Sequence, residues 1–405
     1  MPITTRLSRL VKFLGLRRSI AGALAMAILV GMGERMGERF LPLYIVALGG
    51  GEYLAGMLNG MDNLLSALYS YPGGYLSDRL GIKRSLLVFN LLAMAGYVIV
   101  ILIPAWPAVF VGSVFFLSWT AISLPATMDL VATALPKNKR TMGVSMHSLI
   151  RRVPMGVGPV IGGALMDRFG KVEGMRLAFG VALALAAVSA VLQQGLIGDD
   201  CERKEGEGVC APKPEPNPLA LFREMSPRLR SLLVSDILIR FCEQIPYAYV
   251  VLWACTRVLH PVTYSQFGLL TAAEMTTAVL VYIPVAYLAD RGNKKPFVAV
   301  TFVFFTLFPL ALLYSQSLWP LLAAFVLRGL KEFGEPTRKA LIMDLAPEGR
   351  KAAMFGLYYL MRDTIVSIAA FGGAGLWLIS PEVNFLTAFG FGVAGTVWFV
   401  WRGKE

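Results

Sequence analysis

The chain has 405 residues, of which 56% are hydrophobic and only 16% are charged. A soluble protein carries roughly 25% charged residues, and no long polar faces cover the apolar runs, so the composition argues against a soluble helical protein. The formal net charge of +12 alone could indicate a nucleic-acid-binding protein, but the distribution of Lys and Arg described below excludes that class.

Residues 1–18 combine Arg and Lys with apolar side chains such as Leu7, Leu10 and Phe13. We expect a basic amphipathic segment that lies on the membrane surface. A cleaved signal peptide is disfavoured, because the apolar run that follows is long and no small-residue cleavage site is clear.

Twelve apolar windows follow. A membrane-spanning helix needs about 20 mostly apolar residues, and the Gly and Pro inside the windows are tolerated in such helices. The windows are 19–47, 52–77, 84–104, 106–134, 141–166, 175–196, 230–255, 263–289, 295–315, 317–345, 351–379 and 383–401. The expected fold is an all-α integral membrane protein with twelve transmembrane helices.

One long polar stretch, residues 198–229, mixes charges of both signs and ends in a series of prolines. We expect a mobile cytoplasmic linker between an N-terminal six-helix bundle (19–197) and a C-terminal one (230–405). Cys201 and Cys210 lie in this linker and Cys242 and Cys255 in a membrane helix, so we expect no disulfide.

The basic residues favour one side of the membrane. With the N-terminus inside, the inner loops and termini hold Arg6 to Arg18, Arg79 to Arg84, Lys137 to Arg140, Arg203 to Arg230, Arg291 to Lys295, Arg350, Lys351, Arg402 and Lys404. The opposite loops hold only Arg168, Lys171, Arg176 and Arg257. By the positive-inside rule both termini are cytoplasmic, and we expect a plasma membrane, such as a bacterial inner membrane.

The two halves repeat one another. Matching residues are Asp62/Glu274, Asp78/Asp290 and Arg79/Arg291, each 212 apart; Pro125/Pro336, Pro136/Pro347, Arg151/Arg362 and Gly162/Gly373, each 211 apart; and Arg35/Arg240 and Glu38/Glu243, each 205 apart. An ordered series of this kind predicts parallel six-helix repeats about an axis along the membrane normal.

A charged turn joins the second and third windows. It reads Gly-Tyr-Leu-Ser-Asp-Arg-Leu-Gly-Ile-Lys from Gly74, and a second copy surrounds Asp290 and Arg291. The pattern resembles the loop 2–3 signature of major facilitator superfamily transporters, although Ile82 stands where the family usually has Arg. The resemblance implies a gating role for Gly74, Asp78, Arg79, Gly81, Lys83, Asp290 and Arg291. In the family this Asp meets the N-terminus of helix 11 and holds the inner gate shut, a role that Asp78 would take.

Charged residues also lie inside the windows, where charge is costly and marks a functional interior by default. They are Glu34, Arg35, Glu38, Arg39, Asp62, Arg151, Arg152, Asp236, Arg240, Glu243, Glu274, Arg328, Lys331, Glu332, Glu335, Arg362 and Asp363. In the family that the chain resembles, helices 1, 4, 7 and 10 line the cavity and helices 2, 5, 8 and 11 form the moving interface, and the charges fall on helices of these two sets. Static pairing is the alternative: Arg35–Glu38, Arg240–Glu243 and Asp236–Arg240 have helical ion-pair spacing.

The fifth window ends in Gly158-Pro159-Val-Ile-Gly162-Gly163. Its small residues let another backbone approach closely, and tight helix packing is one interpretation. The run is also similar to the helix-5 motif of proton-coupled exporters in the superfamily, although Ser145 and Pro154 stand where glycines are usual. This resemblance favours export over import.

We therefore expect a monomeric secondary transporter that moves a small organic solute by alternating access, as a proton-coupled exporter. The alternative is proton-coupled uptake of an organic anion, since arginines occur in both halves. The apolar and aromatic lining expected for an amphipathic solute includes Trp119, Tyr247, Tyr249, Tyr358 and Tyr359. Glu34 is the expected proton carrier, because it lies near mid-span with a like charge, Glu38, one turn away.

Other classes fit less well. The sequence contains no Walker-type loop, so it does not predict transport driven by ATP. It has only two histidines and no Gly-x-Ser-x-Gly elbow, which argues against an intramembrane enzyme. A passive channel would not need duplicated hinge loops. His147 could titrate near neutral pH, but a packed, hydrogen-bonded histidine is the simpler interpretation. We expect protons, the solute and the lipid bilayer as partners, and no nucleic acid, metal or cofactor.

Overall fold

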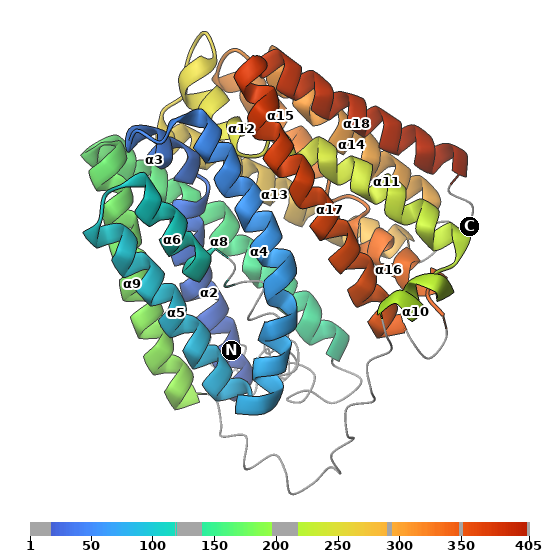
Figure 1. The fold of residues 1–405 in the computed structure, drawn as a ribbon, viewed down its shortest axis with the longest axis horizontal. Coiled ribbons are helices and arrows are strands. Elements are labelled where there is room, and N and C mark those ends of the chain that lie inside the picture. Colours follow the sequence, from blue (N-terminus) through green and yellow to red (C-terminus); the bar gives the residue numbers. More distant parts are fainter. Residues whose placement is uncertain are drawn as a thin grey trace, which may run out of the picture.

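The computed structural model describes residues 18–117, 119, 140–196, 218–289, 294–347 and 351–402. These residues form helices joined by short turns, with no strand among them. They form two helical bundles (Figure 1), and described helical residues fall in each of the twelve predicted windows, which confirms the predicted fold class. The basic segment at residues 1–17 and the linker residues 197–217 lie outside the described part of the chain.

The N-terminal bundle contains seven described helices. They are α2 (Arg18–Glu38), α3 (Leu41–Ala47), α4 (Gly51–Leu80), α5 (Ile82–Leu102), α6 (Trp106–Phe116), α8 (Arg140–Phe169) and α9 (Lys171–Leu196). The first predicted window, 19–47, is therefore two helices, α2 and α3, with a break at Arg39 and Phe40. Pro42 in the first turn of α3 explains the break, because proline fits a helix start but not a helix interior.

The C-terminal bundle follows the same plan. Its elements are α10 (Pro218–Glu224), α11 (Pro227–Gln244), α12 (Tyr249–Leu252), η3 (Trp253–Arg257), α13 (Tyr264–Ala289), α14 (Lys295–Tyr314), α15 (Leu318–Leu330), α16 (Glu335–Leu345), α17 (Lys351–Ile379) and α18 (Pro381–Arg402). Windows 230–255 and 317–345 are also interrupted, before Tyr249 and at residues 331–334, and Pro246 and Pro336 lie at these interruptions. Helix α10 lies within the range 198–229.

Two helix pairs join the bundles. Helix α8 packs along α13 and α4 packs along α17, and these are the most extensive contacts between helices. The bundles converge at the end that carries α3 and α12, which we call the far end (Figure 1). They diverge toward the opposite end, where α2 begins and α18 ends (Figure 1); we call this the basic end. The inter-bundle helices are thus equivalents of helices 2, 5, 8 and 11.

Glycine permits two equivalent close approaches of backbone to backbone. Gly162 of α8 touches the backbone of Met36 in α2, and its repeat mate Gly373 of α17 touches the backbone of Ile245 at the end of α11. A side chain at either glycine would collide with main-chain atoms. The sequence repeat is therefore also a repeat in packing.

Six of the described helical stretches are long and apolar enough to cross a membrane: Lys83–Leu102, Lys171–Leu196, Pro227–Arg257, Lys295–Tyr314, Met354–Ile379 and Pro381–Arg402. Helices α5, α9, α14 and α18 expose apolar side chains such as Leu91, Val188, Val303 and Val397. These helices form lipid-facing walls around the charged inner helices.

Candidate functional site

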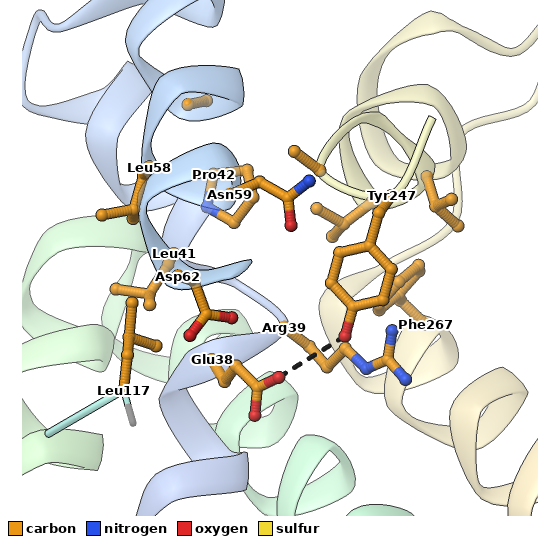
Figure 2. A pocket seen from close by; sticks show the side chains of 14 residues that line it. Glu38, Arg39, Leu41, Pro42, Leu58, Asn59, Asp62, Leu117, Tyr247 and Phe267 are labelled. Atoms are coloured by element: carbon orange, nitrogen blue, oxygen red, sulfur yellow. Dashed lines mark hydrogen bonds between the residues drawn. The ribbon is translucent and has the colours of Figure 1, made fainter. Parts of the chain in front are cut away.

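A small cavity of about 40 Å³ lies between the two bundles (Figure 2). Most of its lining is apolar: Leu41, Pro42, Ala55, Leu58, Leu117, Ala248, Val250, Val251 and Phe267. The polar groups are Glu38, Arg39, Asn59, Asp62 and Tyr247. The breaks after α2 and after α11 place Arg39 and Tyr247 here, because each residue lies where a helix is interrupted.

Three of the polar groups contact one another across the bundles. Figure 2 shows the Tyr247 hydroxyl of the C-terminal bundle donating a hydrogen bond of 3.4 Å to Glu38 of the N-terminal bundle. The Arg39 guanidinium lies 5.0 Å from the centre of the Tyr247 ring. Glu38 also forms an ion pair with Arg35, the i,i+3 pair that the spacing indicated. Glu38 is thus held by Arg35 and Tyr247.

The Asp62 carboxylate points into the cavity beside Glu38 (Figure 2). No hydrogen bond or ion pair joins it to another of the described residues, although Glu34, Glu38 and Arg35 lie near enough to act on it electrostatically. Glu34 of α2 is only 4% exposed and does not line the cavity. A cavity carboxylate without an ion-pair partner can accept a proton or a cationic group.

The C-terminal bundle repeats the N-terminal ion pair. Arg240 donates to Glu243 at 2.6 Å, and Lys331, in the break between α15 and α16, donates to the other oxygen of Glu243 at 2.6 Å. This doubly paired carboxylate is fixed in place. The predicted Arg240–Glu243 pair is therefore present, as its counterpart Arg35–Glu38 is.

Asp236 does not follow the predicted pairing with Arg240. Its carboxylate pairs with Arg338 of α16 and with Arg362 of α17, at 3.5 Å for the latter, and accepts a 3.1 Å hydrogen bond from Tyr358. Arg338 also binds Glu335 at 2.6 Å. This buried network joins α11, α16 and α17, and sequence reasoning missed its central residue, Arg338. The available signal was spacing: Arg338 continues the helical stripe of Arg328, Glu332 and Glu335 by three residues.

Glu274 is buried beside two cations. Its carboxylate lies 3.3 Å from Arg328 and 3.7 Å from Lys331, yet neither oxygen has a hydrogen-bond partner among the described residues. The repeat mates Asp62 and Glu274 are therefore not equivalent: Asp62 faces the cavity and pairs with no cation in the described part of the chain, whereas Glu274 is enclosed with two cations.

One ion pair crosses between the bundles at mid-depth, from Arg152 of α8 to Glu332 in the break before α16, at 2.8 Å. The neighbouring Arg151 is half-buried and makes no hydrogen bond or ion pair with another described residue.

The far end is closed by further contacts between the bundles. Glu52 of α4 accepts hydrogen bonds from Arg257 at 2.8 Å and from the Trp377 indole at 2.6 Å. Asp167, near the end of α8, accepts from the backbone amides of Tyr264 and Ser265, at 3.0 and 2.8 Å, in the first turn of α13. The hydrogen bonds described above that join the two bundles all lie at this end or at mid-depth. The structure is therefore closed at the far end.

The comparisons with known proteins agree with this geometry. The sequence profile of the Major Facilitator Superfamily matches residues 23–242 and 232–405, which together span nearly the whole chain. The chain belongs to the Major Facilitator Superfamily. It is a multi-pass membrane transporter of the MFS type. An uncharacterised MFS-type transporter of Methanocaldococcus jannaschii is 24% identical over 368 residues, covering 88% of this chain and 87% of that protein.

Solved structures show the same fold at low identity. The crystal structure of a peptide transporter, POT, in complex with sulfate has a TM-score of 0.76 at 16% identity, covering 95% of this chain and 94% of that one. The nucleoside transporter NupG has a TM-score of 0.75 at 14% identity, covering 95% and 100%. The human organic anion transporter TETRAN has a TM-score of 0.66 at 14% identity, covering 94% and 98%.

The superfamily's loop 2–3 motif forms the turn between α4 and α5. Gly81 has φ 79°, a backbone conformation that glycine adopts readily and other residues rarely do, which explains glycine at this position. Arg79 is exposed and Lys83 half-buried beside it. The surroundings of Gly74 and the side chains of Asp78 and His147 lie outside the described part, as do residues 290 and 291. The gating role therefore stays a prediction.

The helix-5 motif of this MFS transporter lies at two helix contacts. Gly158 touches Arg35 and Met36 of α2, and Gly163 touches the backbone of Tyr264 in α13, across the bundles. Gly268 of α13 in turn touches the backbone of Pro159. The motif thus lets α8 approach a cavity helix and the opposite bundle at once.

The predicted aromatic residues lie in different places. Only Tyr247 lines the cavity. Tyr249 stacks on Trp377 at the far end, with ring centres 4.3 Å apart, and Tyr358 binds Asp236. Within the described part of the chain, no group of three or more His, Cys, Asp or Glu side chains could hold a metal ion.

Proposed function

We propose that this MFS transporter exports amphipathic organic solutes that carry a positive charge, in exchange for protons, by alternating access. The observation that carries the proposal is the Asp62 carboxylate, which faces the inter-bundle cavity without an ion-pair partner among the described residues. A carboxylate in this position attracts a cation, and the apolar walls around it suit the body of an amphipathic molecule.

Asp62 also supplies a mechanism for proton exchange. A carboxylate that faces the cavity can hold either a proton or a cationic group, but not both at once. Proton and solute then compete for one group, so each displaces the other. Export in exchange for protons follows when the two sides of the membrane differ in pH.

The contacts around the carboxylates favour a different proton carrier from the one that the sequence favours. Glu243 is bound by Arg240 and Lys331, which makes it a poor proton carrier. Glu34, the carrier that the sequence favours, is buried away from the cavity lining. We therefore propose Asp62 as the exchanging group and keep Glu34 as the second candidate.

Alternating access is supported by the one-sided closure. If the basic end faces the cytoplasm, as the positive-inside rule predicts, this conformation faces inward in a plasma membrane with both termini inside. Each chain contains both bundles and the whole cavity, so we propose a monomer. The helix-5 motif supports export as the direction.

Proton-coupled uptake of an organic anion is the second candidate function. Arg39 favours it, because its guanidinium lines the cavity and its contact there is with the Tyr247 ring. However, Arg35, Arg152, Arg240, Arg328, Arg338 and Arg362 all pair with carboxylates. Because these arginines are paired, the presence of arginines in both halves does not give the cavity a large unpaired positive charge.

The proposal is tested by binding of tetraphenylphosphonium, an apolar cation, to the purified full-length protein by isothermal titration calorimetry across pH 5.5 to 8.5. Wild type should bind more weakly at low pH and release protons on binding, and Asp62→Asn should bind weakly at every pH with no proton release. Glu382→Gln, which removes an exposed carboxylate outside the cavity, is the matched control. If Glu34→Gln abolishes the proton release while Asp62→Asn does not, Glu34 is the carrier. If a carboxylate anion such as benzoate binds instead of the cation, uptake of an anion is the better account.

A further inference from the structure

A second hollow lies on the outer surface of the C-terminal bundle, between α11 and α18 near the basic end. It is an open groove of about 610 Å³ whose lining includes Arg228, Arg230, Ser231, Trp398, Trp401 and Arg402. Both helices are among those apolar enough to cross a membrane. The groove is separate from the inter-bundle cavity, with which it shares no lining residue.

The charge of the groove is positive. Among the described residues that line it, three are arginines and none is acidic. Arg228 and Arg402 are exposed and form no ion pair with another of the described residues, although Arg402 lies over two indole rings. The third, Arg230, donates to the carbonyl oxygens of Phe222 and Arg223 at 3.0 and 3.1 Å, which ties helix α10 to the groove.

The two tryptophans indicate the depth of the groove in the membrane. The Trp398 indole donates a 3.2 Å hydrogen bond to the Ser231 hydroxyl and so joins α18 to α11. The Arg402 guanidinium lies 5.3 Å from the Trp398 ring and 5.1 Å from the Trp401 ring. Tryptophan gathers where a membrane helix meets the headgroup layer. The arginines thus lie at headgroup depth.

An apolar surface continues from the groove toward the middle of the membrane. Val234 of α11 is 40% exposed, and Val397 and Val400 of α18 are 58% and 55% exposed. Acyl chains can lie along these side chains while a phosphate meets the guanidinium groups. A free phosphate ion would use the arginines alone and leave this surface without a role.

We propose that the groove binds one phospholipid with a negatively charged headgroup, its phosphate between Arg228 and Arg402 and its chains along the α11–α18 surface. Guanidinium groups bind phosphate through paired, charge-assisted hydrogen bonds, and basic pockets between membrane helices are typical sites for anionic headgroups. The lipid would bridge α11 and α18 near the basic end, where the Trp398 indole already joins the two helices through its hydrogen bond to Ser231.

The test is native mass spectrometry of the purified full-length protein mixed with phosphatidylglycerol or phosphatidylcholine of the same acyl chains. Wild type should retain one phosphatidylglycerol, at least tenfold more tightly than phosphatidylcholine. Arg228→Gln and Arg402→Gln should each weaken retention about fivefold, since a basic residue near the membrane surface contributes about 1 kcal/mol. Arg84→Gln, which removes an exposed arginine at the basic end of α5, is the matched control and should leave retention unchanged.

Three outcomes would overturn the proposal. Equal retention of the two lipids by wild type, or an equal loss in Arg84→Gln, would mean that the groove does not select the headgroup. Displacement of the lipid by millimolar glycerol 1-phosphate would mean that the site binds phosphate without needing the chains. Size-exclusion profiles of all three variants, expected to match wild type, separate lost lipid from lost folding.

Discussion

Asp167→Asn should loosen the far-end closure. Asp167 of the N-terminal bundle accepts hydrogen bonds from two backbone amides in the first turn of α13, in the C-terminal bundle. A carboxylate at a helix N-terminus contributes about 0.3–1 kcal/mol when exposed and up to about 2 when partly buried. Because Asp167 is exposed, we take about 1 kcal/mol. The ratio of far-end-open to far-end-closed molecules should therefore rise about fivefold.

Spin-label distances across the far end measure this ratio. Suitable sites are the exposed residues Ile103 and Leu259, one in each bundle, replaced by cysteine in a variant that lacks the four native cysteines. Glu173→Gln is the matched control, because this far-end carboxylate pairs with Arg176 within its own bundle. A distance distribution that is unchanged in Asp167→Asn, or equally changed in Glu173→Gln, would refute the reasoning.

Three further predictions concern other parts of the molecule. Arg338→Met removes a partner of the buried Asp236 carboxylate and of the partly buried Glu335 carboxylate, and breaking a buried ion pair typically costs about 3–5 kcal/mol; Tm in detergent should fall sharply, whereas the exposed Arg223→Met should leave it unchanged. Gly162→Val places a side chain against the backbone of α2, and overpacking costs about 1–3 kcal/mol; Tm and turnover should both fall, unlike in Gly180→Val, which points into open space. Asp78→Asn should shift the population toward inward-open and slow turnover, and unchanged spin-label distances between the two inner loops would contradict the gating role.

The number of spans could be predicted from the sequence, because membrane helices need long apolar windows. The two halves could also be predicted, because the repeated residues show which helix of one half matches which helix of the other. The pairs Arg35–Glu38 and Arg240–Glu243 were also predictable, since both depend only on helical spacing. These features are local, so they require no knowledge of how the helices pack.

The features that sequence reasoning missed depend on packing between helices. Asp236 pairs with Arg338, which is 102 residues away, rather than with Arg240 on its own helix, because the break at residues 331–334 brings α16 beside α11. Glu52 and Asp167 lie near helix ends, where charged residues are ordinarily solvated, so nothing in the sequence distinguishes them as contacts between bundles. The helix breaks themselves had a readable signal, namely Pro42, Pro246 and Pro336 inside apolar windows.

Coupled exchange of a cationic solute for protons is the central claim, and ethidium transport in proteoliposomes tests it most directly. The vesicles have an acidic interior, a membrane potential clamped with valinomycin and potassium, and protein-free vesicles as the measure of passive entry. Wild type should accumulate ethidium inside until nigericin collapses the pH gradient, and Asp62→Asn should not accumulate it while Glu382→Gln does. Accumulation that is the same without the gradient, or that requires an alkaline interior, would contradict proton-coupled export.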